Sequence, residues 1–328
     1  MTCTVAISSY DAADYLGACL AQLLNQSLCA HLEIIVIDSG SSEDERSVCD
    51  KYKSQFARLI YERTQREPLY AAWNRALAKA SGRYFVNANT DDALHPHAFE
   101  TLASVLDVES EAALAYGDWL WATVPNAKFP WDPTFRRCVH PEYHPSLPLF
   151  YAYAGCHQFW RTDMLRELGG FDARFTAAGD YEVLCRLALK RWKAVYVPEV
   201  VSAFYQNPNG LSRSSDASFK EFIEIRDNFR KTFNIEDIYE LDPADTGACS
   251  AAWVDLARRA LSPGIPWAER DMPDKEFAAF CACRALKLEP GNVEASRLLN
   301  NAAINPKGVR WILRRLLAAK PLRAALSA

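Results

Sequence analysis

Carboxylate side chains stand in three polar segments of the sequence, and carboxylates can do several kinds of chemistry. One segment contains Asp38, the second is Asn89-Thr90-Asp91-Asp92, and the third contains Asp180. An ionised carboxylate can hold a divalent cation, accept hydrogen bonds from N–H groups and hydroxyls, or remove a proton from a reacting hydroxyl. Aspartate also caps helices and closes turns, so residue type alone does not decide between chemistry and local structure.

The elements around these carboxylates follow an alternating pattern. Apolar runs predict strands at residues 4–8, 32–37, 58–61 and 84–86, with helices at about 13–26 and 69–80 and a further helix opened by Pro96. This alternation predicts an α/β fold with a mostly parallel sheet. Because ligands bind such sheets beyond the carboxyl ends of the strands, the positions of Asp38 and of residues 89–92 at strand ends indicate a binding site.

Six motifs carry a resemblance to a known family. They are VAISSYDAADYL, EIIVIDSGSSEDE, YAAWNRALAKASGRYFVNANTDD, CHQFWR, LGGFDARFTAAGDYEVLCRL and a late Leu-Ser pair at 211–212. In this order, over about residues 4–215, the series resembles family 2 glycosyltransferases of the GT-A fold. The resemblance implies a Rossmann-like mixed sheet that binds a nucleotide-diphosphate sugar, with UDP the most frequent nucleotide. It also implies transfer of the sugar, with inversion, to a hydroxyl of a glycan, lipid-linked or protein acceptor.

The resemblance places a metal and the donor sugar at residues 89–92. Asp91 stands in the DxD-type position and would hold Mn²⁺ or Mg²⁺, which needs few protein carboxylates because phosphates complete its shell. Asp92 would lie near the donor sugar or the metal, or would cap the helix expected at Pro96. Asn89 replaces an aspartate and would contact ribose or sugar. Asn207 stands near a position where the family often carries a histidine, which makes it a weak candidate metal ligand.

The nucleotide pocket is expected at the ends of the first two strands. In the family, the aspartate at the position of Asp38 contacts the base or ribose, and an acceptor-only carboxylate suits those donors. The alternative is a turn aspartate that bonds its own backbone. Ser8 and Tyr10 would line the same pocket or serve the turn, and Asn74 also matches the family's nucleotide side. Arg66 could meet the diphosphate, although a solvated surface arginine is the preferred interpretation.

The resemblance assigns the proton transfer to Asp180. An in-line displacement with inversion needs a carboxylate that takes the proton of the acceptor hydroxyl. Glu182 is the reserve candidate, and a helix N-cap is the alternative role for Asp180. His157 and Gln158 are expected to face the active cleft, on the side of the donor sugar or the acceptor. The aromatic residues between 119 and 160 are expected mostly in the core, with some available to stack on an acceptor sugar.

The chain beyond residue 233 has a different texture. We expect a GT-A domain at residues 1–233 and an all-α C-terminal domain at 234–328, because only helical patterns follow. Residues 285–292 resemble the end of a tetratricopeptide repeat, but such repeats need ~3 copies to stand alone, so these helices are expected to pack on the first domain. The tail 306–328 carries six basic residues and no acidic one. It predicts an amphipathic helix that either docks on the protein or lies on anionic lipid.

Composition excludes several other classes. A net charge of −4 over 328 residues argues against a nucleic-acid binder. Ten scattered cysteines, with no signal-peptide pattern and no apolar run of ~20 residues, indicate a cytoplasmic protein, with peripheral attachment at the inner face of the membrane left open. A nucleotidyltransferase would show a Gly-rich basic loop after the first strand, where Ser8-Ser9-Tyr10-Asp11 stands instead. The remaining alternative is a non-catalytic nucleotide-sugar-binding or scaffold protein that acts through its helical region.

Overall fold

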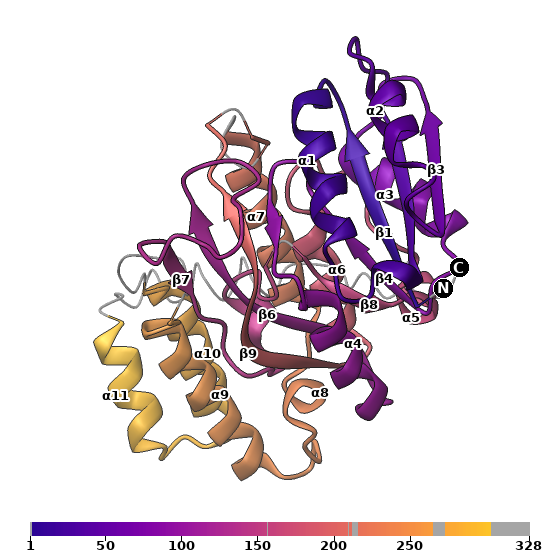
Figure 1. Ribbon diagram of the computed structural model, residues 1–328. Helices are drawn as coiled ribbons and strands as arrows, with labels where there is room; N and C mark the ends of the chain where they lie inside the picture. Colours follow the sequence, from indigo (N-terminus) through magenta and orange to yellow (C-terminus); the bar gives the residue numbers. More distant parts are fainter. Residues whose placement is uncertain (1, 156, 209, 212–215, 265–272, 303–328) are drawn as a thin grey trace. The chain divides into compact units, whose positions relative to one another are not determined.

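The computed structural model describes residues 2–155, 157–208, 210–211, 216–264 and 273–302 (Figure 1). The backbone divides into two compact units. The first comprises residues 1–143, 152–187 and 192–222, and the second comprises 144–151, 188–191 and 223–328. The first unit therefore ends at residue 222, earlier than the expected boundary at 233, and the division into independent domains stays a prediction.

A parallel half-sheet begins the first unit. Its strands lie in the order β3-β2-β1-β4, with every neighbouring pair parallel. Their bounds are β1 (Cys3–Ser9), β2 (Leu32–Asp38), β3 (Arg58–Arg63) and β4 (Tyr84–Asn87), joined by α1 (Ala13–Leu24), α2 (Glu45–Tyr52) and α3 (Leu69–Lys79). The register pairs Ser9 with Asp38. The carboxyl ends of these strands thus meet at one edge of the sheet, as the alternation of elements predicts.

Burial explains why these segments form strands. Every residue of β2 is buried, and such a mostly apolar strand is typical of one that is covered on both faces. Close packing also constrains the entry to β4. A Cβ at Gly82 would lie 2.5 Å from the backbone nitrogen of Thr4, so only glycine fits there.

The second half of the sheet contains antiparallel pairs. β8 (Phe159–Arg161) runs antiparallel to β4, and β6 (Ala112–Ala122) runs antiparallel to β8. β9 (Lys193–Tyr205) is parallel to β6, and the short strands β5 (Ala93–Leu94) and β7 (Arg136–Cys138) pair with β9 and β6 respectively. The result is the mixed α/β sheet that we expected. Because β5 pairs with the end of β9, the turn at residues 89–92 lies beside residues 205–207.

One predicted element begins at a different residue. Pro96 does not open a helix; α4 (Ala98–Val108) begins later, with His97 as its N-cap residue. The short strand β5 intervenes between the turn and the helix, so Asp92 does not cap α4. The remaining helices that contribute to the first unit are α5 (Thr162–Glu167), α6 (Gly179–Leu189) and the first part of α7 (Asp216–Thr232).

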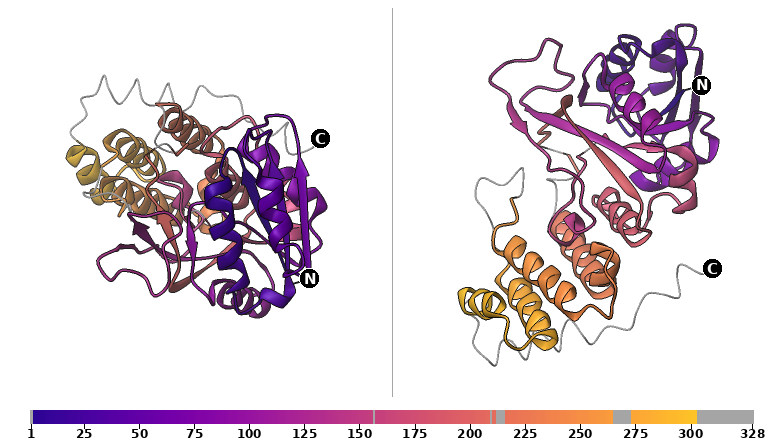
Figure 2. Two further views of the ribbon diagram at one scale, coloured as in Figure 1. Left: turned by 45° about the horizontal axis from the view of Figure 1, so that its top comes forward. Right: turned by 90° about the horizontal axis from the view of Figure 1, so that it is seen from below.

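The second unit is helical in its described part. It contains α8 (Ile235–Tyr239), α9 (Thr246–Leu261), α10 (Lys275–Leu288) and α11 (Val293–Asn301), and α10 packs against α9 and α11 (Figure 2). The side chains of Asp245, Asp274 and Asn292 cap α9, α10 and α11. The predicted helical region is therefore present. No helix among the described residues has the length and apolar character to cross a membrane, and the basic tail 306–328 lies outside the described residues.

Candidate active site

Asp92 anchors the turn that follows β4. Its Oδ1 accepts the backbone N–H of Tyr205 at 2.8 Å, and its Oδ2 accepts the side-chain amide of Asn89 at 2.8 Å. The Nε2 atom of His157 lies 3.8 Å from the same Oδ2. Burial lowers the pKa of His157 to about 4, so this ring is neutral near pH 7. Asp92 therefore ties the turn to the end of β9.

Two polar residues that we did not predict hold this turn in place. The backbone N–H of Asn126 donates to the carbonyl of Asp91 at 2.8 Å, and its side-chain amide donates to the carbonyl of Thr90 at 3.1 Å. Gln22 of α1 donates to the side-chain oxygen of Asn126 at 2.9 Å and accepts the backbone N–H of Leu94 at 3.1 Å. Isolated polar residues so far apart in the sequence form no motif, so sequence reasoning had no signal for them.

Asp91 is the carboxylate of the turn that suits a divalent cation. It is half-buried, whereas Asp92 is buried and both of its oxygens accept N–H groups. The described residues contain no group of three or more His, Cys, Asp or Glu side chains arranged to hold a metal. A cation at Asp91 would therefore need oxygen atoms from a diphosphate, which is how Mg²⁺ usually binds beside phosphates.

Asn207 lies beside Asp91 in an orientation that differs from our expectation. Its amide nitrogen donates to Oδ2 of Asp91 at 2.9 Å. An amide nitrogen does not bind a hard cation, because its lone pair is delocalised into the carbonyl. The structure therefore places the amide nitrogen of Asn207 as a donor to Asp91, and a role for its side-chain oxygen as a metal ligand stays a prediction.

Asp38 is fully buried at the end of β2. Its Oδ1 accepts the backbone N–H of Ser41 at 2.8 Å, its Oδ2 accepts the hydroxyl of Tyr61 at 2.5 Å, and Arg63 lies 3.6 Å away. Burial by itself would raise the pKa of Asp38, but hydrogen bonds from Tyr61 and Ser41 together with Arg63 bring the pKa below its ordinary value. Asp38 thus has the turn role that the sequence left open, and contact with a nucleotide stays a prediction.

Tyr10 and Arg66 form an exposed pair near this edge of the sheet. The guanidinium carbon of Arg66 lies 3.7 Å from the centre of the Tyr10 ring, and Tyr10 is 46% exposed. Ser8, near the end of β1, is half-buried. Arg66 is thus an exposed surface arginine, as preferred from the sequence, and it also stacks on an aromatic ring in a cation–π contact.

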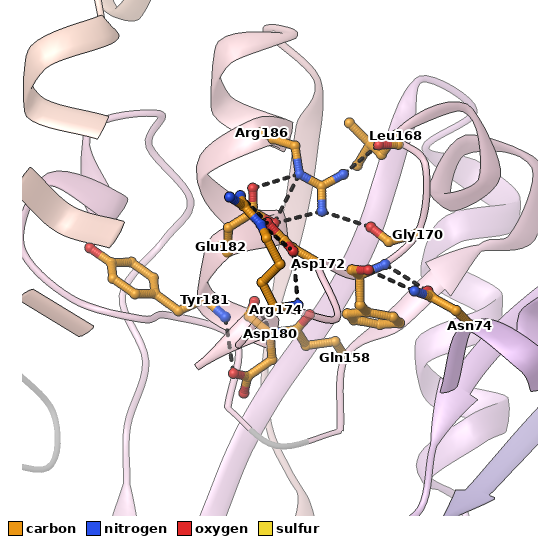
Figure 3. Close-up of polar contacts among 11 residues, drawn as sticks. Asn74, Gln158, Leu168, Gly170, Asp172, Arg174, Asp180, Tyr181, Glu182 and Arg186 are labelled. Atoms are coloured by element: carbon orange, nitrogen blue, oxygen red, sulfur yellow. Dashed lines mark hydrogen bonds and ion pairs between the residues drawn. The ribbon is translucent and has the colours of Figure 1, made fainter. Parts of the chain in front are cut away.

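Asp180 lies in the first turn of α6, which begins at Gly179. Its Oδ1 accepts the hydroxyl of Tyr70 at 3.0 Å and the backbone N–H of Tyr181 at 3.0 Å (Figure 3 shows the latter contact). No residue in the described part of the chain donates to Oδ2. Burial raises the pKa of Asp180 to about 6, partly offset by the Tyr70 and Tyr181 hydrogen bonds. A carboxylate with this pKa is ionised at neutral pH and is a stronger base than an ordinary aspartate.

Glu182 is engaged elsewhere. It forms an ion pair with Arg186 at 2.7 Å, and Arg186 also donates to the carbonyls of Leu168 and Gly170 (Figure 3). The pair thereby fastens α6 to the loop that precedes it. Glu182 as the reserve base stays a prediction, and in the structure its carboxylate is held in this ion pair.

Asn74 binds the backbone of the loop that precedes α6. Its amide nitrogen donates to the carbonyl of Phe171 at 2.6 Å, and its oxygen accepts the N–H of the same residue at 2.8 Å (Figure 3). This two-point contact closes the loop before α6, where Gly170 adopts a φ of +70°. Both ends of the Asn74 amide thus bind backbone, and contact of Asn74 with the nucleotide stays a prediction.

His157 and Gln158 are buried, at 4% and 2% exposure, and the expectation that they face the active cleft stays a prediction. His157 lies against Asp92. Gln158 donates to the backbone carbonyl of Asp180 at 3.1 Å and accepts the indole N–H of Trp160 at 3.1 Å. The two neighbours thus connect the turn at residues 89–92 with the start of α6, supporting both carboxylates from inside the unit.

Comparison with known proteins shows which family the sequence resembles. Residues 4–163 match the family model described as Glycosyl transferase family 2. Over 227 residues the chain is 25% identical to a PGL/p-HBAD biosynthesis glycosyltransferase of Mycobacterium bovis, covering 67% of this chain and 82% of the relative. It is also 29% identical over 116 residues to glycosyltransferase GlyA of Streptococcus pneumoniae serotype 4, covering 35% of this chain and 16% of that protein.

A solved structure shares the fold. The crystal structure of S. aureus TarS 1–349 in complex with UDP matches with a TM-score of 0.57 at 15% identity, covering 96% of this chain and 90% of that chain. At this identity the similarity shows the fold alone, and it confirms the predicted GT-A fold class.

Proposed function

We propose that this chain catalyses an inverting, metal-assisted transfer of a sugar from a nucleotide-diphosphate sugar to a hydroxyl. The premise is that the chain belongs to glycosyl transferase family 2 and is a glycosyltransferase. The observation that carries the proposal is the setting of Asp180. Its Oδ1 is held by two donors, no described residue donates to Oδ2, and burial raises its pKa to about 6. Asp180 would act as the general base toward the acceptor hydroxyl.

The leaving nucleotide would be held at the turn of residues 89–92. When bound there, Mn²⁺ or Mg²⁺ supplies charge stabilisation to the departing diphosphate. Asp91 would be the protein ligand of this ion, oriented by the Asn207 amide. Asp92 and Asn89 would hold the shape of the turn, because their side chains bond one another and Asp92 also accepts the N–H of Tyr205 at the end of β9.

The donor nucleotide would be UDP. TarS, which shares the fold, has been crystallised with UDP and with UDP-GlcNAc. Ser8, Tyr10 and Asp38 lie at or just beyond the carboxyl ends of β1 and β2, the edge where such folds bind ligands. The acceptor hydroxyl would belong to a glycan, lipid-linked or protein acceptor, as part of polysaccharide or glycoconjugate biosynthesis.

Nucleotide release from a panel of UDP-, GDP- and dTDP-sugars tests the proposal. Wild type would be assayed with Mn²⁺, Mg²⁺ or EDTA, beside Asp91→Ala, Asp180→Asn and the exposed control Asp50→Asn. We expect one donor to be turned over, with loss of release in EDTA and in Asp91→Ala. Removal of a general base typically lowers the rate by ~10²–10⁴. The rate of nucleotide release by Asp180→Asn should therefore fall by that factor, while the rate of Asp50→Asn stays at the wild-type value. Full release by Asp180→Asn, or by wild type in EDTA, would contradict the proposed mechanism.

A further inference from the structure

Tyr70 is a buried residue of the YAAWN motif that the proposed function leaves without a role. It lies near the start of α3, is 1% exposed, and donates its hydroxyl to Oδ1 of Asp180 at 3.0 Å. The two residues stand 110 positions apart in the sequence. A buried tyrosine hydroxyl normally has a partner, and here the partner is the carboxylate proposed as the base.

The ring of Tyr70 is fixed by its neighbours. Trp73 packs edge-on at 5.2 Å between ring centres, and Phe171 stacks at 5.9 Å. On a third side, a Cβ added to Gly179 would lie 2.8 Å from ring carbons of Tyr70. Only glycine lets α6 begin this close to the ring, so packing determines where the hydroxyl points.

The hydrogen bonds to Asp180 are divided unevenly between its oxygens. Oδ1 receives both the Tyr70 hydroxyl and the Tyr181 N–H, while no donor to Oδ2 occurs among the residues that the structure describes. Two donors on one oxygen fix the rotation of the carboxyl group, and the other oxygen keeps its lone pairs for an incoming proton.

We propose that Tyr70 is a positioning residue for the base: its hydroxyl holds Oδ1 of Asp180 so that Oδ2 is presented to the acceptor hydroxyl. The inference rests on the proposed function, in which Asp180 takes the proton. Tyr70 itself touches neither substrate nor the reacting atoms, and acts through Asp180.

The charges around Asp180 set the sign of the expected effect. Burial raises its pKa, the hydrogen bond from Tyr70 lowers it, and the negative charge of Glu221 on α7 raises it. Glu221 accepts the N–H groups of residues 176–178 at 2.8–3.1 Å, so it lies beside the entry to α6. On α6 itself, Glu182 and Arg186 pair with one another. Removing the Tyr70 hydroxyl should therefore move the pKa of Asp180 upward.

Tyr70→Phe tests the proposal, with Tyr84→Phe as a matched control. Tyr84 is also buried and donates its hydroxyl to a carboxylate, that of Asp107, which has no proposed part in the reaction. We expect Tyr70→Phe to lower kcat roughly tenfold, because hydrogen bonds to charged groups are among the stronger ones. We also expect the acid limb of kcat/KM to move to higher pH while KM for the donor stays unchanged. Tyr84→Phe should leave all three quantities at wild-type values.

The outcomes separate this inference from the proposed function. If Asp180→Asn is inactive but Tyr70→Phe keeps the wild-type kcat and acid limb, the positioning role is wrong and the base assignment stands. If Asp180→Asn remains active, the base assignment fails and the inference falls with it. A folding defect in Tyr70→Phe lowers the rate equally at every pH, so a lower rate without movement of the acid limb also overturns the positioning role. In the Asp180→Asn background, Tyr70→Phe should cause no further loss.

Discussion

Replacing Asp180 with asparagine should make the folded protein more stable at alkaline pH while it removes activity. The folded chain raises the pKa of this carboxyl from 3.8 to about 6 because it is buried. A group with a higher pKa in the folded state holds its proton more tightly when folded. Ionisation of this carboxyl therefore lowers the stability of the folded state. The full cost applies at pH values above 6, it declines between pH 6 and pH 3.8, and it disappears below pH 3.8.

The size of the effect follows from the two pKa values. The difference, 6 − 3.8, multiplied by about 1.4 kcal/mol per pH unit, gives about 3 kcal/mol at pH 8. At pH 5 the folded carboxyl is already mostly protonated, and about half of this cost remains. Asparagine is uncharged and of the same shape, and its oxygen can still accept the Tyr70 hydroxyl and the Tyr181 N–H.

Urea unfolding at pH 8 and pH 5 measures this difference. The free energy of unfolding of Asp180→Asn should exceed that of wild type by up to about 3 kcal/mol at pH 8 and by about half as much at pH 5. Nucleotide release should be lost at both pH values. Asp50→Asn, an exposed aspartate, controls for the loss of one negative charge. A destabilised Asp180→Asn at pH 8, or a difference that is equal at both pH values, would show that burial does not penalise this carboxylate.

Two further substitutions test the loop and the helix start that position Asp180. Asn74→Ala should destabilise the protein by ~1–3 kcal/mol, because the N–H and carbonyl of Phe171 lose their partner, and KM for the donor should not change. A raised KM at unchanged urea stability would instead support the nucleotide role of Asn74. Gly179→Ala places a methyl group 2.8 Å from the Tyr70 ring and should cost ~1–3 kcal/mol and lower kcat. If Gly179→Ala matched wild type in its unfolding curve and in its turnover, the close packing of α6 on Tyr70 would be contradicted.

The family resemblance is confirmed, and local pattern explains why. Strands expected at residues 4–8, 32–37 and 84–86 are observed as β1, β2 and β4. Continuous apolar runs with polar ends are sufficient to predict buried strands and the edge where a ligand binds. The start of α4 was the exception, because a two-residue strand such as β5 is too short to produce a periodic signal.

Motif matching was less informative about individual side chains. Asn74, Glu182 and Asn207 match the family in position or lie near its functional residues, yet their partners are the Phe171 backbone, Arg186 and Asp91. A motif specifies which residue type is present, whereas the partner depends on which element packs opposite it. The roles of Asp38, Asp91 and Asp180 in catalysis remain predictions that the variants above test.

The sequence by itself predicted the fold class, the resemblance to family 2 glycosyltransferases and the carboxylates that lie at the edge of the sheet, because those properties follow from local apolar pattern and short motifs. Only the tertiary structure decided how each carboxylate is held. Tyr70 meets Asp180, and Asn126 meets Thr90, through hydrogen bonds between elements distant in the chain. Such contacts depend on packing in three dimensions and leave no spacing in the sequence, so the state of the proposed base was set by the fold.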